Sequence, residues 1–265
     1  MKKTTLFGLC VSALCSFSAT ALAEDAPGFW SDFSGMSGGM LAYKPKYEGS
    51  NVYDIGPAPL VDLTWRDFIF LNDSGLGAYV VHNENFHVGF SAGYRFEQKA
   101  ADVGLGSDIG QVYGGLNGAM TARFNQGPFS IGAVLNHQFT GTDSGYLVNL
   151  SAEGMLPLGE KLFARGTLQA DWADQTYMNK YFGVSGIQSA ASGTTAFNAS
   201  SGFKSVGVVA AIGYRISDRW VVMGTGGYTR LIGDAAASPV SRNDNQFIVG
   251  LGITHFFGKN PDAEK

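Results

Sequence analysis

Residues 86–96 read FHVGFSAGYRF, and in this stretch large apolar side chains alternate with small or polar ones. Because successive side chains of a β-strand point to opposite faces, the stretch predicts a strand with one apolar face and one polar face. The same alternation returns along the chain in segments of about ten residues, the length that crosses a bilayer in a β-barrel. It is clearest near residues 110–125, 148–154, 162–172, 206–215 and 247–254.

The alternation fits both a soluble β-sandwich and a membrane barrel, and three further features favour the barrel. The apolar faces carry aromatic side chains near their ends, such as Phe96 and Tyr228, which is typical of the aromatic girdles at membrane interfaces. The segments exceed the usual soluble strand length of about 5 to 6 residues. Short turns also alternate with long loops, and the long loops lie near residues 97–109, 175–201 and 232–245. Outer-membrane barrels place their long loops on the outer side.

We therefore predict an all-β fold, a transmembrane antiparallel up-and-down β-barrel of about twelve strands. Ten strands is the alternative, because the three strands near residues 58–81 look short. An even number puts both termini on the periplasmic side, and closure leaves no strand edge unpaired in lipid. The predicted strands lie near residues 35–46, 58–65, 66–72, 75–81, 86–97, 110–125, 129–140, 146–157, 162–174, 202–216, 219–231 and 246–257.

The N-terminus predicts export from the cytoplasm. Two lysines near the start precede an apolar run over residues 6–17, and a small-x-small pattern ends at Ala23. This is the pattern of a cleaved secretory signal peptide, residues 1–23. The apolar run is too short for a spanning anchor, which needs about 20 residues. Residues 24–265 then form a single barrel domain, which we expect in the outer membrane of a Gram-negative bacterium, in contact with lipid and lipopolysaccharide.

Composition and motifs exclude several kinds of site. The only cysteines, Cys10 and Cys15, lie in the predicted signal peptide, so the mature chain has no disulfide and no thiol metal site. The net charge of -4 gives no basic surface for nucleic acid. The four histidines lack metal-ligand spacing, and none pairs clearly with a carboxylate and a nucleophile. We therefore expect no metal, no cofactor and no enzyme activity.

Charged residues on the polar faces are the first candidate site, because in a membrane barrel that face lines the lumen. Buried charges cost several kcal/mol each unless they are paired, so one interpretation is that these groups compensate one another across a narrow interior. The alternative is a water-filled path for a small solute. The candidates are Arg95, Arg123, Glu153, Arg165, Asp171 and Arg215, with Asp62 beside them.

The longest loop, residues 175–201, is the second candidate site. It carries Tyr177, Tyr181, Phe182 and Phe197, an unusual number of aromatic side chains for a solvated loop. One interpretation is that the loop folds inward and plugs the mouth of the barrel. The other is that its aromatic side chains form a surface that binds a partner. Asp234 is a further candidate, because the stretch around it is expected to pack beside this loop.

Three motifs occur in order along the mature chain. They are PKYEGS at residues 45–50 followed by PAP at 57–59, YMNKYFGVS at 177–185, and LIGDAAASP at 231–239. With these motifs the chain resembles the MltA-interacting protein / OmpV family of outer-membrane proteins. Strand parity puts all three motifs in outer loops, so we expect them to meet at one rim.

The resemblance implies a non-enzymatic scaffold or adaptor that links a murein hydrolase to a murein synthase, with a lytic transglycosylase and a penicillin-binding protein as partners. Two alternatives stay open: a narrow outer-membrane pore for small solutes, and a surface adhesin. A murein scaffold must work from the periplasmic side, whereas the family motifs lie in predicted outer loops. The residues that bind a partner therefore do not follow from the motifs.

Overall fold

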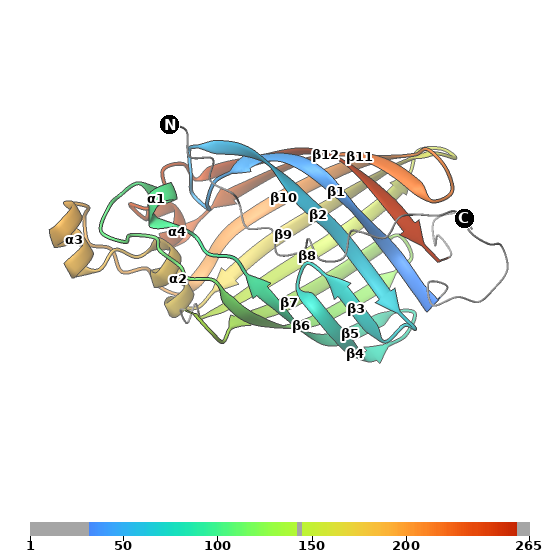
Figure 1. Cartoon of the computed structure of the whole chain (residues 1–265), viewed down its shortest axis with the longest axis horizontal. Helices are drawn as coiled ribbons and strands as arrows, with labels where there is room; N and C mark the ends of the chain where they lie inside the picture. The colour runs from blue at the N-terminus through green and yellow to red at the C-terminus, as the bar shows by residue number, and fades with distance from the viewer. Residues whose placement is uncertain (1–31, 142–144, 259–265) are drawn as a thin grey trace, which may run out of the picture.

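A computed structural model describes residues 32–141 and 145–258, and within them twelve antiparallel strands close into one barrel (Figure 1). Each strand pairs with its neighbours in the sequence, and the first strand pairs with the last, which confirms the predicted class, strand number and topology. The predicted signal peptide lies outside the described residues. The strands are β1 (Phe33–Pro45), β2 (Tyr53–Trp65), β3 (Ile69–Asn72), β4 (Gly75–His82), β5 (Phe86–Arg95), β6 (Gly115–Gln126), β7 (Phe129–Gln138), β8 (Tyr146–Pro157), β9 (Leu162–Ala173), β10 (Gly202–Arg215), β11 (Trp220–Leu231) and β12 (Asn245–Phe257).

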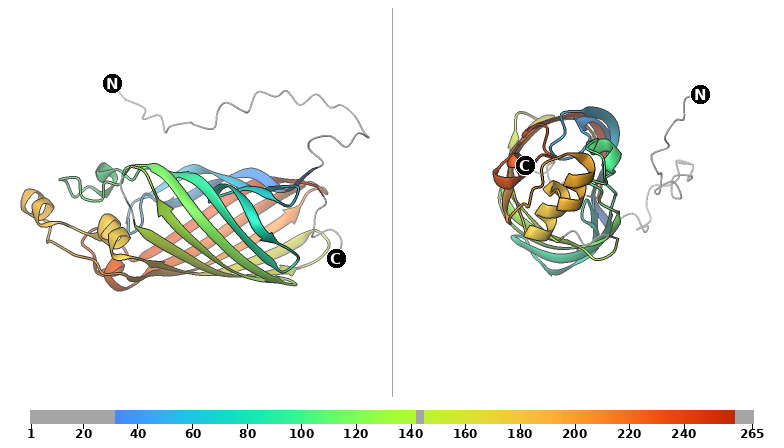
Figure 2. Two further views of the ribbon diagram at one scale, coloured as in Figure 1. Left: turned by 90° about the horizontal axis from the view of Figure 1, so that it is seen from below. Right: turned by 90° about the vertical axis from the view of Figure 1, so that its left-hand side faces the viewer.

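The two ends of the barrel differ. One end, here called the loop end, carries the helices α1 (Ala100–Val103), α2 (Gln175–Phe182), α3 (Gly186–Ser192) and α4 (Gly233–Ala237) (Figures 1 and 2). The other, here called the turn end, carries short connections such as Gly127 and Pro128 between β6 and β7. The described chain begins with β1 and finishes with β12 at the turn end (Figure 1). The prediction that this end faces the periplasm stays a prediction.

The outer surface of the wall is apolar. Leu168, Val249 and Leu251 are 63%, 58% and 69% exposed, and many other large apolar side chains of the strands share this surface. A soluble monomer rarely exposes an apolar area of this size, whereas hydrocarbon solvates it. Within the described ranges, no helix is long and apolar enough to cross a membrane.

The structure corrects the predicted starts of three strands, of which β3 begins at Ile69 instead of near residue 66. β2 begins at Tyr53 instead of near residue 58, so Pro57 and Pro59 both lie within the strand. The strand predicted over 110–125 begins only at Gly115. The five residues before it belong to the loop, where Val112 forms an isolated bridge with Gln98. Val112 is buried there, so the apolar side chain that indicated a strand faces the core of the loops instead.

Candidate functional site

A polar cavity of about 1280 Å³ fills the lumen. Its lining runs from His82 and His87 near the turn end to Asn149 and Asp171 near the loop end. Six of the predicted lumen residues line it, namely Asp62, Arg95, Arg123, Glu153, Arg165 and Asp171. Arg215 does not: its Nη1 donates to the carbonyl oxygen of Glu160, 3.2 Å away in the turn between β8 and β9. The assignment of Arg215 to the lumen is corrected accordingly, because the strand ends at this residue and its side chain meets the rim.

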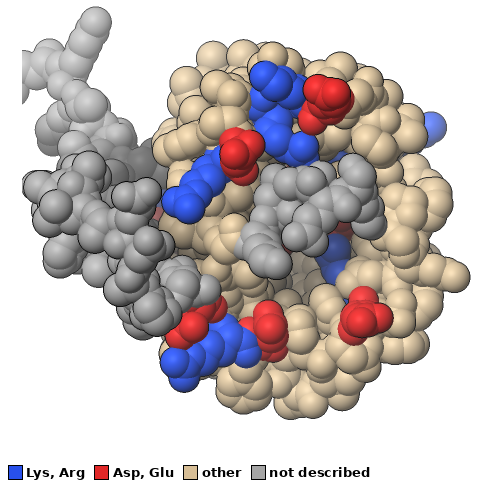
Figure 3. All heavy atoms as spheres, turned by 90° about the vertical axis from the view of Figure 1, so that its right-hand side faces the viewer, with Lys and Arg blue, Asp and Glu red and all other residues tan. Residues whose placement is uncertain are grey.

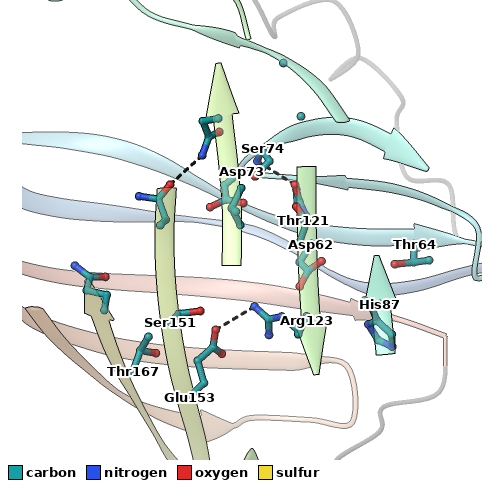
Figure 4. A pocket seen from close by; sticks show the side chains of 18 of the residues that line it. Asp62, Thr64, Asp73, Ser74, His87, Thr121, Arg123, Ser151, Glu153 and Thr167 are labelled. Atoms are coloured by element: carbon teal, nitrogen blue, oxygen red, sulfur yellow. Dashed lines mark hydrogen bonds and ion pairs between the residues drawn. The ribbon is translucent and has the colours of Figure 1, made fainter. Parts of the chain in front are cut away.

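One ion pair crosses the middle of the cavity wall. Arg123 Nη2 on β6 lies 3.1 Å from Glu153 Oε1 on β8, and its Nη1 lies 3.5 Å from the Ser130 hydroxyl on the strand between them (Figure 4). The two side chains are 40% and 22% exposed to the water-accessible lumen, so screening leaves the pair a small share of the stability. The Arg123–Glu153 pair agrees with the interpretation that charges in the lumen neutralise one another.

Nearer the loop end, a chain of side-chain hydrogen bonds runs around the wall from β6 to β9. Asn117 donates to Asn136 over 3.2 Å, Asn136 to Asn149 over 2.9 Å, and Asn149 to Asp171 Oδ1 over 2.7 Å. Each amide donates to the next strand, and the carboxylate accepts the last bond. Linked hydrogen bonds of this kind polarise one another and fix the relative orientation of the side chains that they join.

The chain of hydrogen bonds ends at a buried ammonium group. Lys204 is 3% exposed, and its Nζ lies 3.4 Å from Asp171 Oδ2 and also contacts Glu48 Oε1. Ser205 donates a further hydrogen bond of 2.9 Å to Asp171 Oδ2. A buried cation requires such partners, because burial without them costs several kcal/mol. Glu48 comes from the β1–β2 loop, so this cluster ties a loop to the barrel wall.

Above this cluster, α2 lies across the mouth of the barrel (Figure 2). Asp174 caps the helix by accepting a 2.8 Å hydrogen bond from the backbone N–H of Tyr177. The helix buries Tyr177, Met178 and Phe182. An apolar cluster forms here from α2, α4, the ends of three strands and the segment between α3 and β10. Its residues are Leu147, Ala173, Tyr177, Met178, Phe182, Ala199, Leu231 and Ala235.

A second apolar cluster joins the loops that carry α2 and α4 to the β1–β2 loop and the β5–β6 loop. It consists of Tyr47, Val103, Ile109, Val184 and Val240, and the Tyr47 hydroxyl donates to the Val240 carbonyl over 3.3 Å. Each residue comes from one of four loops that are far apart in the sequence. The two clusters are together called the plug. They bring the three sequence motifs to one rim, which confirms that prediction.

The aromatic residues of the longest loop therefore belong to the plug. Tyr177 and Phe182 are 4% and 0% exposed, so the interpretation of these side chains as a partner-binding surface is wrong. Burial raises the pKa of the Tyr177 hydroxyl above its ordinary value. Tyr181 accepts a 3.2 Å hydrogen bond from Arg95 Nη1. Arg95 therefore connects the lumen wall to the loop that carries the plug. Asp234 accepts a 2.8 Å hydrogen bond from the Ser200 N–H and so fastens α4 to the same loop.

Sequence reasoning missed Lys204 and Glu48. The register shifts between Phe203 and Ser205, and this β-bulge turns Lys204 inward against the alternation of its strand. The one available signal was the lysine itself, which would be costly on a lipid-facing surface. Across the described parts of the chain, no three His, Cys, Asp or Glu side chains gather closely enough to hold a metal ion.

Comparison with known proteins agrees with this architecture. Two proteins are each 26% identical over 201 residues, which cover 74% of this chain and 72% of theirs: outer membrane protein Omp26La of Vibrio anguillarum and outer membrane protein OmpV of Vibrio cholerae. The NanC porin superposes with a TM-score of 0.50 at 8% identity, over 83% of this chain and 98% of that porin, which shows a common fold.

The barrel with its apolar belt and its likeness to these relatives make this an outer-membrane protein. The family model described as MltA-interacting protein MipA matches residues 37–257, from the first strand to the last. The chain belongs to the MltA-interacting protein MipA family.

Proposed function

We propose that this protein is an outer-membrane scaffold that holds a murein hydrolase and a murein synthase together at its periplasmic face. The observation that carries the proposal is the plug, which lies across the loop end and takes up the aromatic side chains of the longest loop. A barrel built in this way serves as an anchor in the membrane, with the turn end left for partners. The description of the matching family model, MltA-interacting protein, favours the same reading.

The turn end offers a charged rim for such partners. Arg66 Nε lies 2.9 Å from Asp32 Oδ2, and further acidic and basic side chains surround the opening (Figure 3). Glu160 and Asp218 lie in the short turns that follow β8 and β10. Rim charges of this kind chiefly set the association rate and the choice of partner. The proposal therefore places partner selection in these turns and not in the family motifs of the loop end.

The test is direct binding of the folded, full-length mature barrel to a purified lytic transglycosylase and a purified bifunctional penicillin-binding protein. We expect both enzymes to bind, and the charge reversals Glu160→Lys and Asp218→Lys at the turn end to weaken binding. The matched control reverses two exposed acids of the loop end, Glu97 and Asp102, and should leave binding unchanged. If neither enzyme binds a barrel that is shown to be folded, the scaffold is wrong.

A narrow solute pore is the second candidate, because the charged cavity of about 1280 Å³ extends from the turn end almost to α2. No residue of the segment 174–201 lines this cavity, so a pore would require the plug to move aside. Planar-bilayer conductance distinguishes the two proposals. A scaffold gives little ion current, whereas a pore gives current that changes when Arg123 or Arg165 is replaced.

A surface adhesin would instead lose target binding when α3, whose Ile187 is 85% exposed, is removed.

A further inference from the structure

The barrel wall is incomplete between β2 and β5. β2 pairs with β1 along all of Tyr53–Trp65, but with β3 only over Leu63–Trp65. On the other side of the short β3–β4 hairpin, β5 pairs with β4 only as far as Ala92. Within the described chain no ladder joins β2 directly to β5. The wall thus has a notch bounded by residues 53–62, by the β3–β4 turn and by residues 93–95, and Figure 1 shows the hairpin confined to the half nearer the turn end.

The sequence of β2 suits an open edge. The backbone N–H of Arg66 donates to the Asp32 carbonyl over 2.9 Å, just beyond the paired segment, so even-numbered residues of β2 direct their N–H groups toward β1. Odd-numbered residues direct theirs toward the notch. Pro57 and Pro59 are odd-numbered, so each proline removes a donor from the open edge and none from the ladder with β1. The N–H of Ile55 donates to Asp54 Oδ1 over 2.8 Å.

The cavity extends into this notch. Its lining includes Tyr94 and Phe96, which are 59% and 73% exposed on the outer surface, together with Asp73 and Ser74 of the β3–β4 turn. Tyr94 lies on the part of β5 that has no partner on the β4 side, so the cavity borders the gap in the wall. An unpaired strand edge is not stable against hydrocarbon, and irregular backbone at this depth is found where it borders water. The notch is therefore a polar opening in the side of the barrel.

The two rims of the notch differ in chemistry. Asp62 on β2 and Asp73 on the β3–β4 turn line the cavity on the inner side, and in the described part of the chain neither carboxylate has an ion-pair partner (Figure 4). Pro59 and the aromatic rings of Tyr94 and Phe96 are exposed on the outer side. We propose that the notch is a lateral opening that takes a cationic amphiphile from the bilayer, with its head group between Asp62 and Asp73 and its apolar tail between Pro59 and Tyr94.

The two prolines disfavour the other occupant that an open edge invites, an added β-strand. Strand addition requires the free N–H groups of the edge. Of the four odd-numbered positions from 55 to 61, two have no N–H and one donates to a side chain. An amphiphile needs no such donors, because its head group binds carboxylates and its tail binds the apolar rim.

The test measures whether an amphiphile gathers at the notch. The full mature chain, which has no cysteine of its own, is reconstituted in phosphatidylcholine vesicles with a fluorophore on Pro59→Cys or, as the control, on Leu168→Cys. Leu168 faces lipid on a strand that is paired on both sides, with Ala152 and Val208. The probe is an alkyltrimethylammonium ion with a bromine-labelled tail, which quenches fluorophores that it contacts. A shift in gel mobility on heating verifies that each variant is folded.

We expect quenching at position 59 to begin at a clearly lower probe concentration than at position 168. Asp73→Asn should raise the half-quenching concentration at position 59 about tenfold, which corresponds to ~1.4 kcal/mol. Asp62→Asn should act in the same direction, while Asp218→Asn in the β10–β11 turn should have no effect. Equal quenching at the two labelled positions would overturn the proposal. So would an uncharged amphiphile with the same tail that quenches position 59 equally well, or insensitivity to both notch substitutions.

Discussion

Lys204 Nζ lies 3.4 Å from Asp171 Oδ2, and this contact joins β10 to the chain of hydrogen bonds that ends on β9. Lys204 also contacts Glu48, whose loop carries Tyr47 of the second apolar cluster. The ammonium group thus touches one carboxylate of the wall and one carboxylate of the loops. Since the group is buried, its partners hold the plug in one position more firmly than an exposed ion pair would.

Replacing Lys204 with Met should loosen the plug. The change leaves Glu48 and Asp171 without their cation, and removing one partner of a buried pair costs about 3–5 kcal/mol. We expect faster hydrogen exchange in α2 and larger current through planar bilayers than for the unchanged protein. Lys161→Met, at an exposed turn-end lysine, is the control and should alter neither quantity. Unchanged exchange in α2 would show that the ion cluster does not hold the plug.

Gly145→Ala should displace α2. Gly145 has φ +68°, and an added Cβ would come within 2.2 Å of Asp174 Oδ1 and 2.5 Å of the Tyr177 nitrogen, the two atoms of the helix cap. Gly127→Ala is the matched control, because Gly127 has φ +57° but open space around its Cβ position. Both variants carry the backbone strain, about 1 kcal/mol, so only the first should also speed exchange in α2. Equal effects of the two variants would mean that the clash is relieved at no cost.

Proline should be tolerated on one parity of β2 and not on the other. Ala58 pairs with Met40 and directs its N–H toward β1, so Ala58→Pro removes a ladder hydrogen bond and should cost about 3 kcal/mol or more. Pro57→Thr breaks no such bond and should change the free energy of unfolding by no more than about 0.5 kcal/mol. Urea-induced unfolding in vesicles measures both. A Pro57→Thr variant as unstable as Ala58→Pro would contradict the assigned direction of the N–H groups.

The plug should weaken in alkali. Burial raises the pKa of Tyr177, so the folded plug keeps this hydroxyl protonated while an opened plug ionises it near the ordinary value of about 10. The stabilisation is therefore complete below pH 10 and is lost as the pH rises above that value. Protection of the α2 amides from exchange, corrected for the intrinsic rate, should hold up to about pH 10 and fall as the pH rises above that value. Tyr177→Phe should flatten this dependence, whereas Tyr214→Phe on the lipid face should leave it unchanged.

The strands were predictable where one rule governs the side chains. The strand predicted over residues 86–97 matches β5 at its start and to within two residues at its end, because lipid on one side and water on the other impose opposite demands on successive positions. β2 was predicted five residues too short, and the omitted segment ends at Pro57, a residue type that is disfavoured in paired strands. Its prolines are compatible with the strand only because the β3–β4 hairpin ends before it reaches them. The length of that hairpin relative to β2 depends on how the whole barrel pairs, so the local sequence of β2 does not predict it.

The candidate site was predictable in part. The number of aromatic side chains in residues 175–201 indicated a plug, since solvated loops seldom carry so many. The contacts that hold the plug were not predictable, because Lys204 and Glu48 are 156 residues apart and a β-bulge sets the direction of the lysine. Arg215 was misplaced for a related reason. Alternation gives the face of a residue, but not whether its side chain lies in the lumen or beyond the end of the wall.

The hydrogen bond from Tyr47 to Val240 spans 193 residues and links the first hairpin of the chain to the loop before its last strand. A plug whose residues come from such distant parts of the chain cannot form while any strand is missing. An unfinished barrel in the bilayer is therefore a leak, and it becomes tight only when β1 meets β12. For the cell, the time between insertion and closure is a period of lost permeability control, so fast completion of the ring has value apart from the stability of the finished protein.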